Sequence, residues 1–337
     1  MAMKCALIGL GMVSRTYGAA LEASQLVELS LIHARSEQSC AAFIADWPAL
    51  GVDVATTLAD IAASDVDFVI VTTPPNARLE IVEILSAAGK PILMEKPVER
   101  TAGAAEKLVQ LCQMRDVPLG IMLQHRARPI VSVLQKLLPD LGPLHMAEVA
   151  VPWWRDQSYY DVPGRGSYAR DGGGVLISQA IHTLDLLLSL TGGVSSVSAL
   201  AATTGFHKME AEDFVSAGLQ FENGAVGHLF ATTASYPGRG ETITLHYAHG
   251  SAHLEAGALQ VFWQDGRKDS FGTAATSGAG ADPMAFTSDW HQTVIEDFAE
   301  ALTTGRKPLV TGVEALQVHR LIEAIDQASK TGRTISL

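Results

Sequence analysis

A glycine turn close to the start of the chain is the feature that most constrains its fold. Residues 6–8 form a short apolar run, and Gly9, Leu10 and Gly11 follow it directly. A helical pattern of apolar residues then extends over residues 13–23. A buried strand, a glycine turn and a helix in this order are typical of a dinucleotide-binding βαβ unit. The sequence therefore predicts such a unit at the N-terminus.

The residues of this turn suit the binding of a pyrophosphate. Gly9 permits the tight turn, and Gly11 lets the backbone approach phosphates that lie on the first N–H groups of the helix. Ser14 stands where the pattern has a third glycine, and it is small enough for helix and strand to pack closely. We expect Gly9, Gly11, Met12, Val13 and Ser14 to bind a dinucleotide. The alternative is a glycine-rich turn in an ordinary α/β protein.

Composition is that of a cytoplasmic protein with two domains. The chain has 337 residues, of which 47% are hydrophobic, and this length is long for one domain. Apolar runs such as residues 184–190 are too short to span a bilayer, and a net charge of −12 argues against nucleic acid or an anionic membrane as a partner. Cys5, Cys40 and Cys112 lie far apart without metal-ligand spacing, which favours buried thiols in a reducing cytoplasm.

Strand and helix patterns alternate over residues 1–123. After the first unit, strands are expected at 27–32, 67–71, 91–94 and 117–123, and helices at 36–45, 77–88 and 101–115. This alternation predicts a doubly wound parallel sheet with helices on both faces, and ligands bind outside the carboxyl ends of such strands. Side chains that follow two of these strands are therefore expected to bind the cofactor: Thr72, Thr73, Pro74, Asn76, Glu95 and Lys96.

The residues after the second strand predict which cofactor is preferred. An acidic residue about 20 positions beyond the glycine turn normally binds the ribose hydroxyls of NAD. Here Ala34 stands at that position, followed by Arg35 and Ser36. The position has no carboxylate to repel a 2′-phosphate, and Arg35 can pair with one. We therefore expect NADP in preference to NAD, with Arg35 and Ser36 as cofactor-binding residues.

The pattern changes in residues 124–337, which are expected to form a second, α+β domain for substrate binding and oligomerisation. Strand-like runs occur at 145–154, 197–202, 214–221, 225–235, 242–246, 252–255 and 259–263, and Asn223-Gly224 is a hairpin signal. These runs predict an open, mostly antiparallel sheet. Because a broad apolar sheet face is not left exposed to water, we expect a homodimer or homotetramer assembled through it.

One helix of this region, residues 175–190, is apolar except for a polar stripe. Gln179 flanks the stripe, whose four members are Ser178, His182, Asp185 and Ser189. A solvated face would carry Lys or Glu, and residues 175–190 contain neither. The stripe is therefore expected to face a ligand cleft. His182 and Asp185 could also be metal ligands, but the sequence offers no third ligand at a useful spacing, so we expect no metal.

Lys96 stands at the end of a buried strand and directly before Pro97. The proline constrains the backbone on either side of the lysine. Partial burial lowers the pKa of a lysine amine and suits it to proton transfer. The alternative is an ordinary surface lysine at the end of a strand.

Four motifs together resemble one family. Gly9-x-Gly11-x-x-Ser14, Thr73-Pro74-Pro75, Glu95-Lys96-Pro97, and Gly172-Gly173-Gly174 through His182-x-x-Asp185 have the order and spacing of the Gfo/Idh/MocA oxidoreductases, the glucose–fructose oxidoreductase and inositol dehydrogenase group. The resemblance covers essentially the whole chain. It implies a Rossmann domain, a C-terminal α/β domain, and hydride transfer between nicotinamide and a carbinol carbon of a sugar or polyol.

The resemblance also implies roles for individual residues. Lys96 would transfer the proton and anchor the substrate, Glu95 would lie near the nicotinamide ribose, and His182 would bind or polarise the reacting hydroxyl. Many members carry Asp four residues before this histidine, where the present chain has Ser178. The two domains would thus place Lys96 and His182 around one hydroxyl.

The segment from Trp153 to Gly174 is similar to members that act on nucleotide-linked amino sugars or their acids. Its aromatic rings can stack on sugars or bases and its arginines can bind a carboxylate or phosphate, although the tryptophan pair could equally be core. The expected substrate-binding residues are Lys96, Trp154, Arg155, Tyr160, Arg165, Ser178, Gln179, His182 and Asp185. Two other functions stay open: a non-catalytic NAD(P)-binding ligand sensor, and a reductase of a non-sugar carbonyl or dihydrodiol.

Overall fold

The computed structural model describes residues 2–274, 279–280 and 287–337. The chain forms two compact units, one of Met1–Ala127 with Ser288–Leu316 and one of Arg128–Thr287 with Gln317–Leu337. The sequence-based division had a single boundary after residue 123, and the structure differs from it in one important respect. Ser288–Leu316, which the sequence analysis placed in the second domain, belongs to the first unit because its helix packs on the first sheet.

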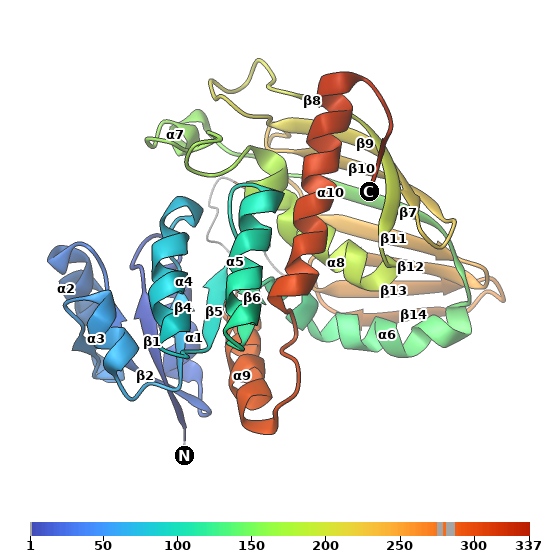
Figure 1. Ribbon diagram of the computed structural model, residues 1–337. Coiled ribbons are helices and arrows are strands. Elements are labelled where there is room, and N and C mark those ends of the chain that lie inside the picture. Colours follow the sequence, from blue (N-terminus) through green and yellow to red (C-terminus); the bar gives the residue numbers. More distant parts are fainter. Residues whose placement is uncertain (1, 275–278, 281–286) are drawn as a thin grey trace. The chain divides into compact units, whose positions relative to one another are not determined.

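The first unit contains a six-stranded parallel sheet (Figure 1). Its strands are β1 (Met3–Ile8), β2 (Val27–His33), β3 (Asp53–Val54), β4 (Phe68–Val71), β5 (Ile92–Glu95) and β6 (Leu119–Met122). Their order is β3-β2-β1-β4-β5-β6, and every neighbouring pair is parallel. This is the strand order of dinucleotide-binding folds, in which the ligand crosses the sheet where the order reverses, beside β1. The expected Rossmann sheet is confirmed.

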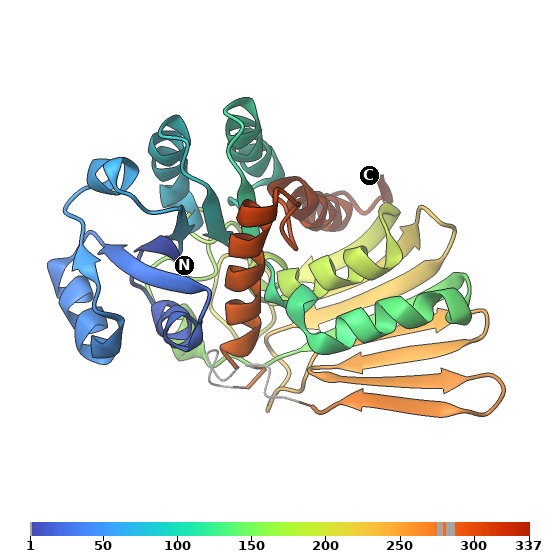
Figure 2. The same ribbon diagram turned by 90° about the horizontal axis from the view of Figure 1, so that it is seen from below.

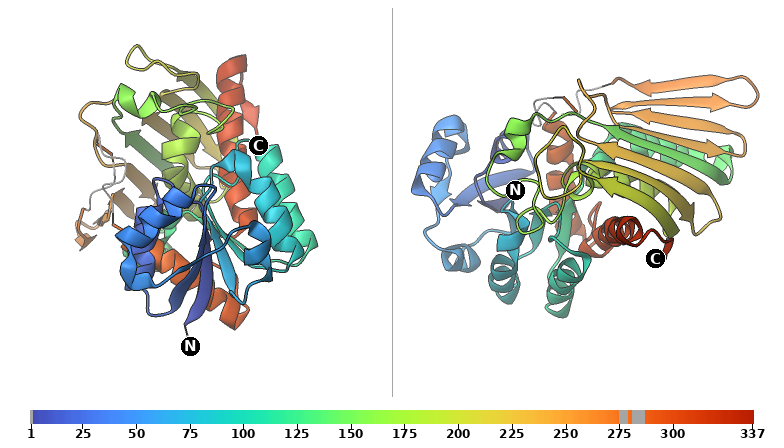
Figure 3. Two further views of the ribbon diagram at one scale, coloured as in Figure 1. Left: turned by 90° about the vertical axis from the view of Figure 1, so that its left-hand side faces the viewer. Right: turned by 90° about the horizontal axis from the view of Figure 1, so that it is seen from above.

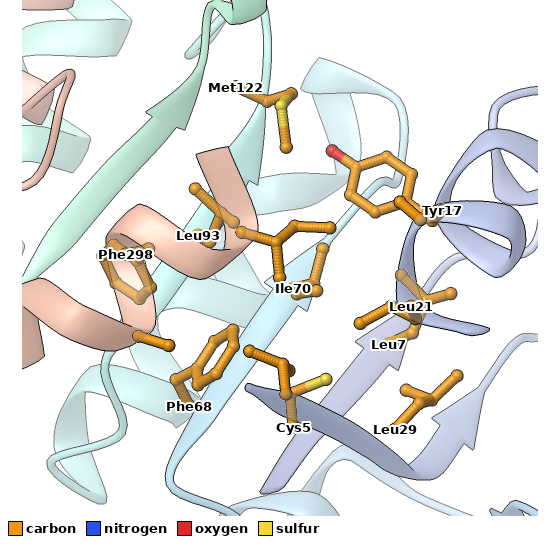
Figure 4. Close-up of a cluster of buried hydrophobic side chains, with 14 of the residues drawn as sticks. Cys5, Leu7, Tyr17, Leu21, Leu29, Phe68, Ile70, Leu93, Met122 and Phe298 are labelled. Atoms are coloured by element: carbon orange, nitrogen blue, oxygen red, sulfur yellow. The ribbon is translucent and has the colours of Figure 1, made fainter. Parts of the chain in front are cut away.

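Helices cover both faces of this sheet. They are α1 (Ser14–Ala23), α2 (Glu37–Asp46), α3 (Leu58–Ala63), α4 (Arg78–Ala87), α5 (Ala102–Met114) and α9 (Asp289–Thr304). Side chains of α1, α2 and α9 form one buried cluster with Cys5, Phe68 and Leu93 of the strands, and Phe298 is the contribution of α9 that Figure 4 labels. The helices α3, α4 and α5 lie next to one another on the opposite face (Figure 2). The apolar pattern predicted neither β3 nor α3, since both are short.

The second unit contains a nine-stranded mixed sheet. Its strands are β7 (Leu144–Pro152), β8 (Val194–Ala202), β9 (Phe214–Phe221), β10 (Val226–Thr232), β11 (Thr242–Tyr247), β12 (Gly250–Glu255), β13 (Ala258–Trp263), β14 (Lys268–Gly272) and β15 (Ile335–Ser336). Their order is β14-β13-β12-β11-β7-β10-β9-β8-β15. Among the described strands β7 and β10 pair in parallel and the other neighbours pair antiparallel, which confirms the mostly antiparallel sheet. The expected hairpin at Asn223-Gly224 joins β9 to β10, with φ +86° at Gly224.

The two faces of this second sheet differ. Alternate residues of β9 and β11 are buried, and the helices α6 (Pro129–Leu141) and α8 (Ile181–Thr191) lie over that inner face (Figures 2 and 3). The outer face exposes large apolar side chains, with 60% of Leu200, 54% of Val226 and 42% of Phe262 accessible. The last long helix, α10 (Gly312–Thr331), runs from the first unit into the second. Within the described residues, each helix is too short or too polar to cross a lipid bilayer.

Candidate active site

The fold itself requires glycine at the first position of the N-terminal turn. Gly9 has φ +98°, and a Cβ at this position would lie 2.9 Å from the backbone nitrogen of Thr73. The hydroxyl of Thr72 stabilises the turn, because it forms a bifurcated hydrogen bond with the carbonyl oxygens of Gly9 and Ile8 as acceptors. Gly9 therefore holds the end of β1 against the turn that follows β4.

Gly11 is glycine for a different reason. Apart from Gly11 and its two chain neighbours, no atom of the described residues lies within 4 Å of a Cβ built on Gly11, and its backbone is not left-handed. The hydroxyl of Ser14 donates to the Gly11 carbonyl at 2.7 Å and fixes the turn. Since the described chain has room for a side chain here, the open space beside Gly11 is the kind that a ligand approaching the backbone would fill.

The start of α1 suits an anion. Its N-cap is Val13, whose side chain makes no capping hydrogen bond, and its first turn contains no acidic residue. By contrast, side-chain oxygens of Ser36, Thr57 and Thr101 cap α2, α3 and α5. The N-terminus of α1 therefore carries partial positive charge that its N-cap side chain does not neutralise. Together with the space beside Gly11, this charge fits a pyrophosphate. The exposed side chain of Met12 borders the same turn.

The end of β2 carries no carboxylate. His33 Nδ1 lies 2.9 Å from the carbonyl oxygen of Ala55, and Ala34 packs against the core of the unit. Arg35 is exposed directly after the strand. The hydroxyl of Ser36 accepts the N–H of Ser39 at 3.4 Å and so caps α2. Arg35 is thus the side chain at this strand end that is available to a phosphate.

The turns after β4 and β5 supply further polar groups at the same edge. The hydroxyl of Thr73 is buried and has no hydrogen-bond partner among the described residues, and Asn76 is exposed in the short helical turn that follows Pro74. Glu95 is buried at the end of β5, where its carboxylate accepts the Tyr17 hydroxyl and the backbone N–H of Lys96, each at 3.0 Å. Burial raises the pKa of Glu95, while the charges of Lys96 and Arg78 oppose that shift.

Two residues near Glu95 were not predicted from the sequence. Tyr17 comes from α1 and its ring is edge-to-face with His291 of α9, with 5.6 Å between ring centroids. His291 Nε2 lies 3.9 Å from Glu95 Oε1. Burial, with a contribution from the charge of Lys96, lowers the pKa of His291 to about 3. This imidazole is therefore neutral near pH 7, and the sequence held no local signal that α9 would bring it here.

A third turn at this edge follows β6. Gln124 and His125 are buried in the short helix η3 (Gln124–Ala127), and the His125 ring is edge-to-face with Trp290 at 6.1 Å between centroids. The Gln124 side-chain oxygen is buried, and no described residue forms a hydrogen bond with it. Neither residue was predicted from the sequence, although both follow a predicted strand just as Lys96 does.

In the second unit, the glycine run before the polar helix serves packing. A Cβ on Gly174 would lie 1.7 Å from the carbonyl oxygen of Glu212. The Glu212 carboxylate accepts the N–H of Gly174 and of Leu176, each at 3.1 Å, and thereby caps the helix that begins there. Burial raises the pKa of Glu212. This helix end is therefore already occupied by a carboxylate of the same chain.

His182 and Asp185 of the polar stripe are buried, and Ser178 and Ser189 are half-buried, which excludes a fully solvated helix face. Asp185 is 1% exposed, His182 is 7% and Gln179 is 4%. The expected single α-helix over residues 175–190 is wrong at its start, where η4 (Leu176–Ala180) is one turn of π-helix before α8. The wider π turn changes the spacing between Ser178 and His182, and such turns are frequent at functional sites. No group of three metal-binding side chains occurs among the residues described.

Tyr159 brings several predicted substrate-binding residues together. Arg165 Nη1 donates to the Tyr159 hydroxyl at 2.8 Å, and its guanidinium lies 4.7 Å from the Tyr159 ring centroid. Gln179 donates to the same hydroxyl at 3.3 Å, and the Arg155 guanidinium lies 5.7 Å from the ring. The amide oxygen of Gln179 is buried and finds no hydrogen-bond partner within the residues that the structure describes. Tyr159 itself was not among the predicted residues.

Other members of this segment make internal contacts. Arg155 is 2% exposed and donates to the carbonyl oxygens of Trp154 and Gly280. The Tyr160 hydroxyl lies 2.6 Å from that of Thr233. Trp153 belongs to the core, whereas the half-buried Trp154 ring packs edge-to-face with exposed aromatic rings. Of the two arginines, Arg165 is the more accessible to a ligand.

Comparison with known proteins gives matches in both units. The Gfo/Idh/MocA model for an oxidoreductase family with an NAD-binding Rossmann fold matches residues 3–122, and the model for the C-terminal domain of the same family matches residues 139–253. D-apiose dehydrogenase of Paraburkholderia graminis is 26% identical over 356 residues, covering 99% of this chain and 89% of that protein. Inositol 2-dehydrogenase of Rhizobium meliloti is 23% identical over 346 residues, with 100% of both chains covered.

A solved structure agrees with these relatives over the full length. The WlbA dehydrogenase from Bordetella pertussis, in complex with NADH and UDP-GlcNAcA, has a TM-score of 0.82 and 26% identity, covering 100% of this chain and 99% of that one. Both domain models, in the expected order, and relatives of matching length lead to one conclusion. The chain belongs to the Gfo/Idh/MocA family of NAD-binding oxidoreductases.

Proposed function

We propose that this enzyme transfers a hydride between a nicotinamide cofactor and a carbinol carbon of a sugar, a sugar derivative or a polyol. The observation that carries the proposal is the position of Lys96. Lys96 follows β5 at the same sheet edge as the glycine turn, and its backbone N–H donates to the buried carboxylate of Glu95. The named relatives, which act on apiose and inositol, support a polyhydroxylated substrate.

The residues of the first unit fit the cofactor. The space at Gly11 and the uncapped start of α1 suit its pyrophosphate, and the turns after β4 and β5 suit its nicotinamide half. The bound nicotinamide supplies or accepts the hydride. The residues that would hold it are Gly9, Gly11, Met12, Val13, Ser14, Arg35, Ser36, Thr72, Thr73, Pro74, Asn76, Glu95 and Lys96.

Removing a hydride from a carbinol leaves a proton that a base must take. We assign that proton transfer to the Lys96 amine, and the binding of the reacting hydroxyl to the His182 imidazole. General acid–base help of this kind is worth roughly a hundred- to ten-thousandfold in rate. Further substrate contacts are assigned to Trp154, Arg155, Tyr160, Arg165, Ser178, Gln179 and Asp185.

Among these substrate contacts, Arg165 has the character of an anion-binding group. Its guanidinium is held on the Tyr159 ring and hydroxyl, so little side-chain freedom remains to be lost when a ligand binds. A carboxylate or phosphate on the substrate is the matching group. This favours a sugar acid or a nucleotide-linked sugar over a neutral polyol.

For the cofactor we propose NADP in preference to NAD. The support is the exposed Arg35 at the end of β2 and the absence of a carboxylate at the position before it. Ala34 stands where NAD enzymes have a ribose-binding carboxylate, which would repel a 2′-phosphate. Titration calorimetry should find a lower Kd for NADPH than for NADH, and Ala34→Asp should reverse the order. A wild type that binds NADH more tightly than NADPH would remove this part of the proposal.

We also propose that the protein is a cytoplasmic homodimer or homotetramer. The outer face of the second sheet exposes Leu200, Val226 and Phe262, and self-association would cover them. All three cysteines are buried and free, as suits a reducing compartment. Light scattering at micromolar concentration should give two or four times the chain mass of 35.7 kDa. A monomer would contradict the assembly.

A substrate screen tests the activity. Purified protein is incubated with polyols, neutral sugars, sugar acids and nucleotide sugars, each with NADP and with NAD, and reduced nicotinamide is followed by absorbance. We expect turnover with at least one class, and with the acidic compounds above the neutral ones. If no class reacts while the cofactor still binds, the protein is a nicotinamide-binding sensor and the proposed activity fails.

A further inference from the structure

A fully buried arginine lies behind the turn that carries Lys96. Arg78 is the first residue of α4 and only 2% of it is exposed. Its Nε donates to the carbonyl oxygen of Thr73 at 2.9 Å. Its Nη1 donates to the carbonyl oxygens of Glu95 and Pro97. One guanidinium therefore binds three main-chain carbonyls in the turns after β4 and β5.

The position of these acceptors matters for Lys96. The Glu95 carbonyl belongs to the peptide group that precedes Lys96, and the Pro97 carbonyl lies one residue beyond Lys96. The backbone before and after the lysine is therefore tied to one rigid group. The third acceptor belongs to Thr73, whose backbone nitrogen packs against Gly9. Arg78 thus connects the lysine turn with the turn that packs on the glycine loop.

Packing alone does not explain a charged residue in this place. Burial lowers the pKa of Arg78 to about 10, while the nearby carboxylates of Glu95 and Glu99 oppose that shift, so the side chain stays cationic at neutral pH. Removing a guanidinium from water is costly, and an apolar side chain of similar length would fill the volume without that cost. What the arginine adds is a planar fork that reaches several carbonyls at once.

We propose that Arg78 is a positioning residue, which fixes the backbone on both sides of Lys96 and so places the lysine amine for proton transfer. The inference rests on the proposed function, since that assigns the proton transfer to Lys96. A displacement of about 1 Å in a reacting group can cost about a hundredfold in rate. Arg78 itself touches neither substrate nor cofactor in this assignment.

The test compares Arg78→Met, Arg78→Lys and the control Arg115→Met. Arg115 is exposed and donates to the Glu83 carbonyl and the Ser86 hydroxyl, each at 2.7 Å, so Arg115→Met removes two arginine hydrogen bonds that lie away from the site. Turnover is expressed per folded molecule, with folding followed by circular dichroism and Tm. We expect kcat to fall about a hundredfold in Arg78→Met and about tenfold in Arg78→Lys, with NADPH affinity within about twofold of wild type. Arg115→Met should keep kcat within about twofold.

A second readout does not depend on turnover. The rate at which an amine-modifying reagent labels Lys96 is measured by peptide mass spectrometry in protein free of cofactor, with the half-buried Lys90 as internal control. We expect Arg78→Lys to change the Lys96 rate at least about threefold and to leave Lys90 unchanged, because placement and environment set amine reactivity. This readout remains informative if the wild type turns over no sugar.

The outcomes separate positioning from a general structural role. Activity per folded molecule that stays at wild-type level in Arg78→Lys, together with unchanged Lys96 labelling, overturns the proposal. A pH profile of kcat that is displaced in Arg78→Lys but not in Arg115→Met supports it. Equal losses of kcat in Arg78→Lys and Arg115→Met overturn it as well, because the effect then does not depend on the lysine turn.

Discussion

The contrast between Gly11 and Gly103 gives a sharp test of the cofactor site. Beyond the adjoining backbone, a Cβ at either position meets no atom within 4 Å in the part of the chain that the structure describes, and neither backbone is left-handed. Replacing glycine by alanine at such positions stabilises a fold by about 0.4–1 kcal/mol, because alanine lowers the conformational entropy of the unfolded chain. Both Gly11→Ala and Gly103→Ala should therefore keep or raise Tm. They differ in place: Gly11 lies in the glycine turn and Gly103 in α5.

The added methyl at Gly11 occupies the space assigned to the pyrophosphate. Losing one charge-assisted backbone N–H contact costs about 1.5–3 kcal/mol, which is roughly a 10- to 100-fold rise in the Kd of NADPH. Titration calorimetry and thermal unfolding measure both quantities on the same samples. Gly103→Ala should leave the Kd unchanged. The reasoning is refuted if Gly11→Ala binds NADPH as wild type does, or if its affinity falls only together with Tm.

Two further predictions concern stability. The fold lowers the pKa of His291 from 6.5 to about 3, so the stability that the neutral imidazole contributes is complete above pH 6.5. It is lost as pH falls toward 3, at up to about 1.4 kcal/mol per pH unit. Denaturant titrations at several pH values should show that the free energy of unfolding falls less steeply with acid in His291→Gln than in wild type, and equal slopes would contradict this. Glu212→Gln replaces one of the two acceptors that cap the Gly174 and Leu176 N–H groups and should cost about 1–3 kcal/mol in thermal unfolding. The exposed Glu210→Gln, as its control, should cost clearly less.

Local patterns predicted the parallel sheet of the first unit and the mostly antiparallel sheet of the second, but not the short or exposed edge strands β3, β14 and β15. Each buried strand of the first unit is a short apolar run bounded by turn residues, and the glycine turn marks where the first helix begins. The placement of α9 could not be predicted in this way. Its apolar stripe shows that it packs, but only the tertiary contacts of Phe298 with Phe68 show on which sheet. The domain division after residue 123 went wrong for that reason.

In the candidate site, too, residues at predicted strand ends could be found from the sequence, and residues placed by tertiary contacts could not. Gly9, Gly11 and Lys96 stand at strand ends that the sequence pattern predicts, so their neighbourhood was foreseeable. Arg78 and His291 were not, because their roles come from carbonyls and carboxylates that only the folded chain brings to them. The same holds for Tyr159 and Glu212, whose partners lie on separate segments of the second unit.

Turnover of Lys96→Ala against its cofactor affinity tests the central claim most directly. With the substrate class that the wild type accepts, kcat should fall at least about a hundredfold, because no other base is assigned to the carbinol proton. The Kd of NADPH should stay within about twofold, and Lys90→Ala, which removes another half-buried lysine, should keep wild-type turnover. Near-normal turnover of Lys96→Ala on that substrate would contradict the mechanism.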